Sequence, residues 1–420
     1  MVQVIKRNGN VVDFQRDKIS VAIQKAMKEV RDEINTYEVR AITDKVINSI
    51  EQRKENISVE EIQDIVERAL MTSGMKDVAK SYITYRYLHG LARDKYQELM
   101  DVVDEKLSAK NVQNQNANVD EKSFGGRVGE TADAVMRKYA LEYCVSSMAK
   151  KNHENNEIYI HDLSSYAVGN HNCLTLPLDD LLANGFNTRQ VDIRPAQSVS
   201  TAFQLVAVLF QLQSLQQFGG VAASHLDWSM VPYVRKSFWK HFKDGMTYIG
   251  GFNANIPEMT DNSGRAIDDP TYTECESWYK YAFDMTKKEV YQAVEAMFHN
   301  LNSLQSRSGN QLPFSSINFG TCTLPEGRIV TKAILETSIK GVGKLHRTSI
   351  FPCSIFQLME GVNREPEDPN YDLYRLALRS TAQRLYPNYA NCDWSGNAGY
   401  DKNDPRTYFA TMGKRKLQLM

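Results

Sequence analysis

Residues 4–19 read VIKRNGNVVDFQRDKI, and this stretch predicts how the chain begins to fold. Apolar residues alternate on both sides of Asn8-Gly9, a dipeptide suited to a type I′ turn, so two short strands are expected to form a hairpin. Asp17 then opens a helix, because apolar residues recur after it at helical spacing. The segment therefore predicts a hairpin that packs against a helix.

Three further amphipathic helices are expected to follow. The second of the four carries a stripe of valines and isoleucines, and the third begins at a capping box formed by Ser58 and Glu61. The fourth is expected to start near Asp77. A hairpin covered by a small helical bundle is enough for one compact domain, which we expect to span residues 1–95.

The rest of the chain alternates helical stretches with short apolar strands, a pattern that indicates an α/β body. Residues 108–130 are rich in Asn, Gln, Lys and Gly and read as a polar linker. With the helix before it, this gives a connecting region over 96–130 and a body over 131–420. Helices are expected over 133–150, 199–218 and 289–306. Strands are expected over 158–160 and 314–319.

Composition excludes several classes of function. Lys and Arg number 50 against 51 Asp and Glu, so no basic field exists to hold nucleic acid non-specifically. The longest purely apolar run, 205–210, is too short to span a bilayer, and the first residues do not resemble a signal peptide. The six cysteines form no C-x-x-C pair. Their spacing argues against a metal site or a disulfide framework and favours a reducing cytoplasm.

The predicted hairpin is basic. Lys6 and Arg7 flank its turn, and Lys18 lies one turn into the following helix. Three cations near a helix start, where unpaired backbone N–H groups point outward, could cradle a polyphosphate. The alternative is a solvated hairpin with ordinary surface charges, which charge spacing alone favours by about two to one because exposed lysines are common.

The same stretch, followed by four helices, resembles an ATP-cone, the regulatory nucleotide-binding module of many ribonucleotide reductases. The likeness covers Met1 to about Leu91 and implies ATP or dATP as allosteric effectors. The nucleotide contacts that it implies are Val4, Lys6, Arg7, Lys18 and Gln63. A transcriptional repressor family also has this module, but there it follows a zinc ribbon, and this sequence has no cysteine quartet.

Residues 158–186 read IYIHDLSSYAVGNHNCLTLPLDDLLANGF. By itself Cys173 could be a thiolate nucleophile, a radical relay or a small buried hydrophobe, and composition favours the last by about three to one. The string is similar to the first active-site segment of the anaerobic (class III) ribonucleoside-triphosphate reductases. The resemblance implies that Cys173 is the second active-site thiol, which faces the substrate. His161 is a candidate for proton handling, and a structural histidine is at least as favoured.

Four more strings extend this resemblance over most of the chain; they cover residues 198–227, 306–323, 350–363 and 368–409. In the family the string at 198–227 packs at the dimer interface and helps to bind a specificity effector dNTP, which implies Gln217 as a contact; core packing is the alternative. The string at 306–323 resembles an inner barrel strand with hydroxyl groups near a ligand's phosphates. Its implied substrate contacts are Ser315, Ser316 and Asn318, and an ordinary buried strand is equally favoured.

The fold that the resemblance implies is the ATP-cone followed by the first half of a ten-stranded α/β barrel of the glycyl-radical type. In intact relatives a radical-SAM activase generates a glycyl radical, which oxidises a loop cysteine to a thiyl. The thiyl abstracts the ribose 3′-hydrogen of a ribonucleoside triphosphate, the 2′-hydroxyl leaves as water, and formate or a thiol supplies the reducing equivalents. A homodimer and a zinc site also belong to this expectation.

The family's Met-Gly-Cys sequence, which carries the thiyl cysteine, stands here as Met412-Gly413-Lys414. Met412 is therefore a catalytic candidate, while Lys414 offers no thiol. Because residues for the glycyl radical and the zinc site are absent as well, we expect a truncated chain that is inactive alone. A non-catalytic nucleotide-binding regulator is the alternative. A formate-lyase type of glycyl-radical enzyme is more distant, since the cone and the HNCL segment speak against it.

Overall fold

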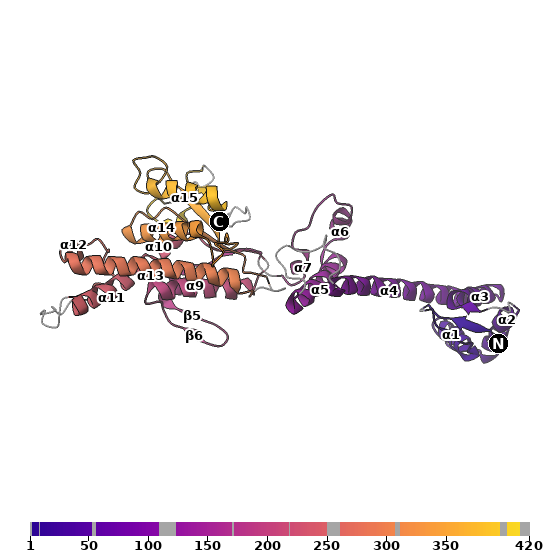
Figure 1. Ribbon diagram of the computed structural model, residues 1–420. Coiled ribbons are helices and arrows are strands. Elements are labelled where there is room, and N and C mark those ends of the chain that lie inside the picture. Colours follow the sequence, from indigo (N-terminus) through magenta and orange to yellow (C-terminus); the bar gives the residue numbers. More distant parts are fainter. Residues whose placement is uncertain are drawn as a thin grey trace. The chain divides into compact units, whose positions relative to one another are not determined.

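The computed structural model describes residues 2–7, 9–52, 56–108, 123–169, 172–217, 219–249, 261–306, 311–394 and 401–411. Its contacts divide the chain into two compact units, Met1–Asp104 and Glu105–Met420. Figure 1 labels most of the helices of both units and the strands β5 and β6.

The amino-terminal unit is a three-stranded sheet covered by helices (Figure 1). Its elements are β1 (Gln3–Ile5), β2 (Val11–Asp13), α1 (Arg16–Lys28), α2 (Thr36–Glu51), β3 (Ile57–Ser58), α3 (Val59–Thr72) and α4 (Lys76–Ser108). The predicted hairpin is confirmed, since β1 pairs antiparallel with β2. Strand β3, which the sequence did not predict, adds a parallel partner on the other side of β1. Buried valine and isoleucine side chains from the sheet and the helices form one core.

The hairpin turn differs from the expected type. Gly9 N–H donates to the Lys6 carbonyl at 2.9 Å, and Lys6 N–H donates to the Asn10 carbonyl at 2.8 Å. Gly9 has a φ of 80°, so the glycine occupies the left-handed position at the end of the turn. This pattern is that of a longer loop closed by a glycine bulge; the type I′ turn expected at Asn8-Gly9 includes Asn8, which lies outside the described residues.

The start of α3 is the predicted capping box. Ser58 Oγ accepts the backbone N–H of Glu61 at 3.2 Å, and the Glu61 carboxylate accepts the N–H of Ser58 at 2.9 Å. Two backbone donors that the helix would otherwise leave unpaired are thereby satisfied. The same residue Ser58 ends β3, so the cap also fixes the join between sheet and helix.

The second unit begins with a helical segment. Its elements are α5 (Phe124–Tyr139), a π-helical turn (Ala140–Cys144), α6 (Ser147–Glu154) and α7 (Leu163–Tyr166). Helix α5 starts inside the range expected for the linker. The strand expected over 158–160 is wrong, because this stretch has no strand partner and Ile160 N–H donates instead to His153 Nδ1 at 3.2 Å.

The body of this unit is built on a five-stranded, all-parallel sheet in the order β10-β9-β8-β7-β4. The strands are β4 (Leu174–Thr175), β7 (Val221–Ala223), β8 (Ser315–Phe319), β9 (Cys353–Leu358) and β10 (Asn388–Asn391); a small hairpin is formed by β5 (Phe186–Asn187) and β6 (Asp192–Ile193). The strand expected over 314–319 is confirmed as β8. A parallel α/β sheet of this size agrees with the half-barrel that the resemblance implied.

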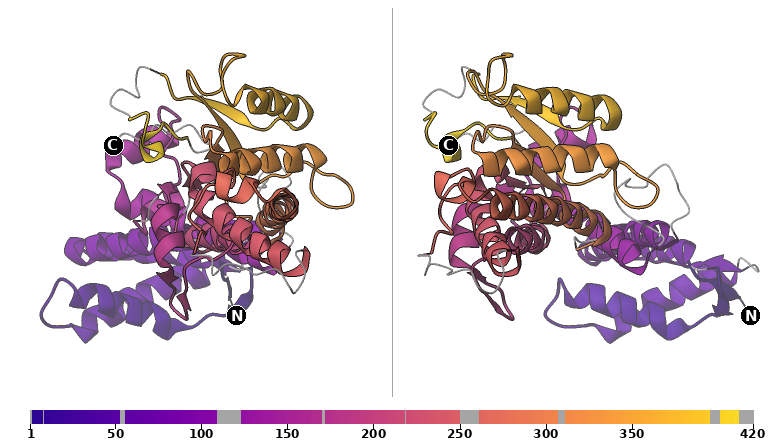
Figure 2. Two further views of the ribbon diagram at one scale, coloured as in Figure 1. Left: turned by 90° about the vertical axis from the view of Figure 1, so that its left-hand side faces the viewer. Right: turned by 60° about the vertical axis from the view of Figure 1, so that its left-hand side comes forward.

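Helices connect the strands and cover one face of the sheet, as the red to yellow ribbons of Figure 2 show. They are α8 (Leu178–Asn184), α9 (Val199–Ser214), α10 (Leu226–Ser229), α11 (Val231–Ile249), α12 (Pro270–Thr273), α13 (Glu276–Ser303), α14 (Pro325–Lys340) and α15 (Tyr371–Arg384); a 3₁₀ turn spans Pro405–Thr407. None of the described helices combines the length and apolarity needed to cross a bilayer.

The register of the sheet separates two sets of side chains. Ile317 and Phe319 of β8 point to the helix-covered face and belong to the main apolar core, as does Phe356 of β9. Because side chains alternate along a strand, Asn318 and Gln357 point to the opposite face. That second face is the one on which polar groups of the strands gather.

Candidate functional site

A cavity of about 530 Å³ opens in the amino-terminal unit, where α1, α3 and α4 meet. This volume falls within the roughly 300–1,000 Å³ of small-molecule sites. The residues that line it include Lys18, Lys25, Lys28, Gln63, Tyr85 and Arg86. Lys18 and Gln63 are two of the residues that the ATP-cone resemblance implied, so the structure brings these two together.

Three lysines of α1 line the cavity together with one acidic residue, Glu29, so basic side chains outnumber acidic ones there. Lys18 and Lys25 are seven residues apart, a spacing that places both on one face of the helix, and Lys28 follows one turn later. Within the described part of the chain, none of the three has a carboxylate at ion-pair distance. Uncompensated ammonium groups attract phosphates, and the exposed ring of Tyr85 offers a face on which a base can stack.

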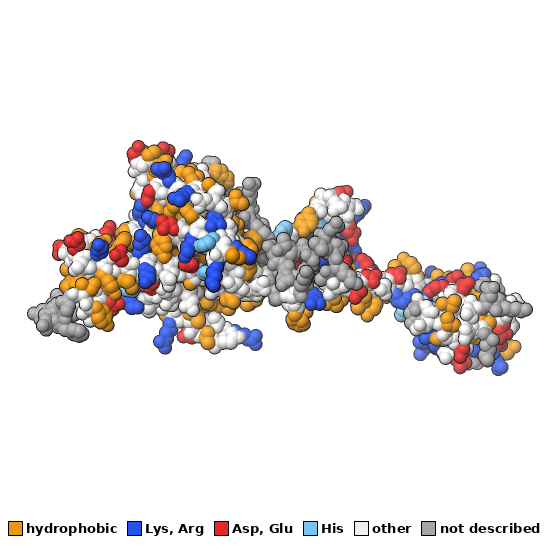
Figure 3. Space-filling model, in the orientation of Figure 1, with side chains coloured by type: hydrophobic (Ala, Val, Ile, Leu, Met, Phe, Trp, Pro, Cys, Tyr) orange, Lys and Arg blue, Asp and Glu red, His pale blue; other side chains and the backbone are white. Residues whose placement is uncertain are grey.

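The cationic character is local. On the face of the amino-terminal unit that Figure 3 shows, basic and acidic side chains are intermixed. At the cavity itself, the spacing of the lysines along α1 brings three cations together. Among the described residues these lysines have no carboxylate at ion-pair distance, although Glu29 also lines the cavity.

The candidate residues of the hairpin do not line the cavity. Val4 is buried in the core of the unit, and Lys6 is exposed and is not among the residues that line the cavity. Arg7 donates through Nε to a carboxylate oxygen of Glu60, and its Nη2 donates to Gln63 Oε1 at 3.1 Å. Of the three hairpin candidates, only Arg7 is thus connected to a residue that lines the cavity.

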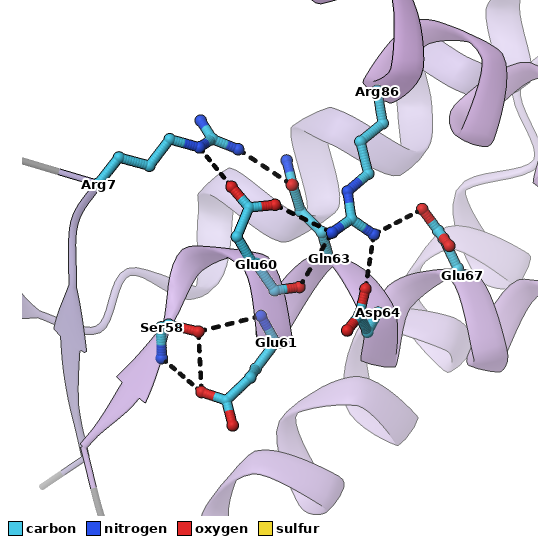
Figure 4. Close-up of polar contacts among 8 residues, drawn as sticks. All are labelled: Arg7, Ser58, Glu60, Glu61, Gln63, Asp64, Glu67 and Arg86. Atoms are coloured by element: carbon cyan, nitrogen blue, oxygen red, sulfur yellow. Dashed lines mark hydrogen bonds and ion pairs between the residues drawn. The ribbon is translucent and has the colours of Figure 1, made fainter. Parts of the chain in front are cut away.

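Arg86 lies at the centre of an acidic cluster, as Figure 4 shows. Its Nη1 donates to Asp64 Oδ1 at 2.6 Å and to Glu67 Oε1 at 2.8 Å, and its Nη2 donates to Glu60 Oε2 at 2.9 Å. Glu60 therefore bridges Arg7 and Arg86. The hydrogen bond from Arg7 holds the pKa of Glu60 below its ordinary value of 4.5, against the opposing effect of partial burial.

Sequence reasoning missed Lys25 and Arg86. Helical spacing could have found Lys25, because it lies two turns after Lys18 on the same apolar-flanked helix. Arg86 follows Tyr82 by four residues on α4, so both lie on one face, but nothing local reveals that this face meets α3.

In the second unit, Cys173 directly precedes β4 and is half-buried. Its Sγ accepts the N–H of Gly220 at 3.4 Å and lies 3.6 Å from the Oδ1 of Asn172. The backbone of Gly219 lies close to Asn172, and this close contact requires glycine, because a Cβ at Gly219 would lie 1.7 Å from the Asn172 carbonyl oxygen. The Gly219-Gly220 pair thus lets the strand β7 begin against the cysteine.

Gln217 meets the same glycine pair. Its side chain is buried; Nε2 donates to the Gly220 carbonyl at 2.7 Å, and Oε1 accepts from Gln213 at 2.9 Å. The residue implied for the effector and the thiol implied for the substrate therefore both contact Gly220.

The three candidates of β8 separate by face. Ser315 alternates to the helix-covered side and is buried, and its Oγ has no partner within the described residues. Ser316 and Asn318 point to the opposite face. Asn318 donates through Nδ2 to the carbonyls of Ala223 at 2.8 Å and Thr411 at 2.9 Å, and its Oδ1 accepts the N–H of Thr411 at 3.0 Å. Both amide donors of Asn318 are thus used on backbone.

A second buried amide holds the same segment. Gln357 Nε2 of β9 donates to the Phe409 carbonyl at 2.8 Å, and the Cys392 thiol donates to that carbonyl at 3.6 Å. Together with Asn318, these side chains fasten residues 409–411 to the polar face of the sheet. The remaining candidates are not gathered here: His161 is exposed and lies 2.6 Å from the carboxylate of Asp162, while Met412 and Lys414 lie outside the described residues.

The turn after β8 is organised by a fully buried carboxylate. Asp227 accepts the backbone N–H groups of Gly320 at 2.8 Å and Cys322 at 2.9 Å, and that of Trp228 at 3.1 Å. Burial raises the pKa of Asp227 above its ordinary value, although the N–H groups of Cys322 and Gly320 act in the opposite direction. The carboxylate closes a loop at the carboxyl end of the sheet.

Comparison with known proteins shows which family has these features. Residues 115–418 match the family model of the anaerobic ribonucleoside-triphosphate reductases, and residues 2–91 match that of the ATP cone domain. The anaerobic ribonucleoside-triphosphate reductase of Haemophilus influenzae is 32% identical over 395 residues, and that of Escherichia coli is 30% identical over 395 residues. These alignments cover 93% of this chain but 52% and 51% of the relatives, so the chain spans about half their length.

Among solved structures, the anaerobic ribonucleotide reductase from Thermotoga maritima, crystallised with dATP and CTP, is 14% identical with a TM-score of 0.46. The likeness covers 74% of this chain and 51% of that chain. The reductase family match spans the unit with Cys173 and the parallel sheet, and the cone match spans the unit with the cationic cavity. By these two matches the chain belongs to the anaerobic ribonucleoside-triphosphate reductase family and carries an amino-terminal ATP cone domain.

Proposed function

We propose that this chain forms the nucleotide-sensing and the Cys173-bearing part of an enzyme that reduces ribonucleoside triphosphates to deoxyribonucleoside triphosphates by anaerobic radical chemistry. The observation that carries the proposal is the cavity of the ATP cone domain. It is lined by three lysines that have no acidic partner among the described residues, and it is large enough for a nucleotide.

The cavity is proposed to bind ATP or dATP as an allosteric effector. Lys18, Lys25 and Lys28 would hold the phosphates, because ammonium groups bind phosphate oxygens as point charges. Gln63 offers an amide for the sugar or base, and the exposed face of Tyr85 can stack on the base. Binding here would change activity at a separate site, which is a coupling between two ligands.

The reductase body is proposed to use Cys173 as the thiol that faces the substrate. The Gly220 N–H fixes the direction of this side chain, and the polar face of the sheet carries Ser316 as a candidate for the substrate's phosphates. Gln217 is proposed to transmit the binding of a dNTP effector, since it shares Gly220 with Cys173.

The whole enzyme would act with further groups and partners. These are a glycyl radical, a radical-SAM activase, a zinc site, formate or a thiol as reductant, and a second copy of the chain. Within the described residues no cluster of three or more His, Cys, Asp and Glu could hold a metal. The zinc site is therefore proposed for parts of the enzyme outside these residues, and a cytoplasmic location completes the proposal.

Isothermal titration calorimetry of the full chain with ATP and dATP tests the effector site. We expect Lys18→Ala to weaken binding about tenfold or more, since a charge-assisted hydrogen bond is worth roughly 1.5–3 kcal/mol. Lys45→Ala is the matched control: this lysine lies on α2, donates to Thr72 Oγ1 at 2.8 Å and does not line the cavity. Absence of binding to the folded wild-type chain, or an equal loss in the control, would contradict the proposal.

A second candidate function is a non-catalytic nucleotide-binding regulator. The observation that favours it is Lys414 after Met412-Gly413, because an ammonium group has no S–H bond from which a thiyl can form. Deoxynucleotide formation by the purified chain with activase, S-adenosylmethionine and formate decides between the two. Turnover would exclude the regulator, whereas nucleotide binding without turnover would favour it for this chain acting alone.

A further inference from the structure

The guanidinium of Arg86 is held by carboxylates that all lie on α3. Glu60, Asp64 and Glu67 are spaced by three and four residues, so they form one acidic stripe facing α4. Glu60 holds Arg86 twice, since its carbonyl also accepts from Arg86 Nη2 at 3.4 Å. Figure 4 shows the three side chains converging on this one arginine, with Arg7 reaching Glu60 from the end of β1.

This cluster adjoins the proposed nucleotide site. Arg86 and Gln63 line the cavity, and Gln63 accepts from Arg7 at 3.1 Å. The three carboxylates outnumber the two arginines, which leaves the cluster with a net charge of about −1 by simple counting. Without a ligand, two of the cations best suited to bind phosphate are therefore occupied by acidic side chains.

We propose that Glu60 is a built-in competitor for the phosphates of the cone's ligand: a bound polyphosphate replaces Glu60 as the partner of Arg7 and Arg86. A guanidinium binds phosphate with the same fork of N–H donors that it presents to a carboxylate, so the exchange needs no new geometry. This inference rests on the proposed effector site and adds its regulation.

Solvent exposure makes the exchange favourable. The Glu60 side chain is 49% exposed, and that of Arg86 is 22% exposed. Ion pairs that water reaches contribute little, and a triphosphate brings more negative charge to the two guanidinium groups than one carboxylate does. A triphosphate attracted by the lysines of α1 can therefore displace Glu60.

The exchange changes how α3 is attached to α4. The start of α4 is held separately, because Arg31 binds the carboxylate of Asp77 through two bonds at 2.9 and 3.0 Å. Arg86 lies nine residues later, about 14 Å along the helix at 1.5 Å per residue. Replacing Glu60 removes one of the three carboxylates that tie Arg86 to α3, while Asp64 and Glu67 still accept from Arg86 and the start of α4 stays anchored. Effector binding thus weakens the attachment of α4 to α3 near Arg86 without removing it.

Calorimetry of the full chain with ATP, dATP and inorganic tripolyphosphate tests the inference. We expect Glu60→Gln to bind each ligand about two- to fivefold more tightly, which corresponds to removing a surface ion pair of roughly 0.5–1 kcal/mol. Glu38→Gln is the matched control, since Glu38 pairs with Arg31 at 3.0 Å with similar exposure, and the pair does not line the cavity. The control should leave all three affinities unchanged.

Hydrogen exchange supplies another readout. ATP should speed amide exchange of α4 around and beyond Arg86 in the wild-type chain, and Arg86→Gln should show the faster exchange already without ATP. Unchanged or weaker binding by Glu60→Gln would overturn the inference while leaving the effector site intact. Tighter tripolyphosphate binding by Glu60→Gln, with no binding of ATP or dATP to any variant, would sustain the inference and contradict the proposed function.

Discussion

Two polar networks, one in each unit, use opposite strategies. Around Arg86 in the ATP cone domain, charged side chains pair where water reaches them, and several acids share one guanidinium. Around β8 in the reductase body, Asp227 and Asn318 are fully buried and bind backbone groups. Exposed ion pairs exchange partners at little cost, whereas buried hydrogen bonds to backbone cannot be broken cheaply. The first network is suited to respond to a ligand, and the second to hold a structure.

Removing the buried carboxylate of Asp227 is expected to have the largest effect on stability, and it is the strongest test of this comparison. Asp227→Ala should lower the free energy of unfolding of the body by roughly 2–6 kcal/mol, because it leaves buried N–H groups of Gly320 and Cys322 unpaired at about 1–3 kcal/mol each. Urea unfolding followed by circular dichroism measures the loss. Asp261→Ala is the control, since that carboxylate is exposed and, among the described residues, accepts only from Ser263 close by. Equal, small losses in both variants would show that burial does not set the difference.

The Asp227 carboxyl also makes the free energy of unfolding depend on pH, and the direction of this dependence follows from the raised pKa. Burial raises the pKa of Asp227 in the folded chain above its ordinary 3.8, so the folded state holds this proton more tightly than the unfolded state does. A raised carboxyl pKa favours folding at low pH, and the contribution is lost as the pH rises above about 4. Asp227→Asn removes this titration. Urea unfolding across this pH window should show the stability of the variant improving relative to the wild type as the pH increases.

The second largest loss of stability is expected from removing the side-chain amide of Asn318. Asn318→Ala should cost roughly 1–3 kcal/mol, because the N–H of Thr411 and the carbonyl of Ala223 lose their partner. It should also raise hydrogen exchange at residues 408–411. Asn370→Ala is the matched control: it removes an equally buried amide bonded to the carbonyls of Gly320 and Cys322, and it leaves residues 408–411 protected. Equal exchange in both variants would mean that Asn318 is not what fastens this segment.

Sequence reasoning succeeded where the signal is local. The hairpin, the capping box of Ser58 and the strand β8 each follow from residues within a few positions of one another. It failed for β3, which has two residues and exists through its pairing with β1, far away in sequence. It also failed over 158–160, where apolar alternation is present but no neighbouring strand among the described residues completes the hydrogen bonds.

The residues of the candidate site show the same difference between local signals, which the sequence reveals, and distant contacts, which it does not. Lys18 was found because it follows a recognisable hairpin, and Cys173 because its flanking string is distinctive. The partners of Asn318 and Gln357 lie 93 and 52 residues away in sequence. Whether an asparagine on a strand meets a ligand or a backbone segment depends on what crosses its face of the sheet. A short sequence pattern does not contain that information.

The smallest expected effect on stability belongs to Arg86, although this residue pairs with three carboxylates. Arg86→Gln removes contacts to three carboxylates, yet it should lower the stability of the ATP cone domain by only about 1 kcal/mol, because water and salt reach the half-exposed carboxylates of Glu60 and Asp64, although the pair with Glu67 is partly buried. The loss should shrink further at high salt. Urea unfolding at low and high ionic strength measures both, with Arg31→Gln as a control pair of similar exposure. A loss above about 2 kcal/mol that salt does not reduce would mean that Arg86 is part of the fold. Glu60 would then not be free to yield its place to a phosphate, and the contrast between the two networks would fail.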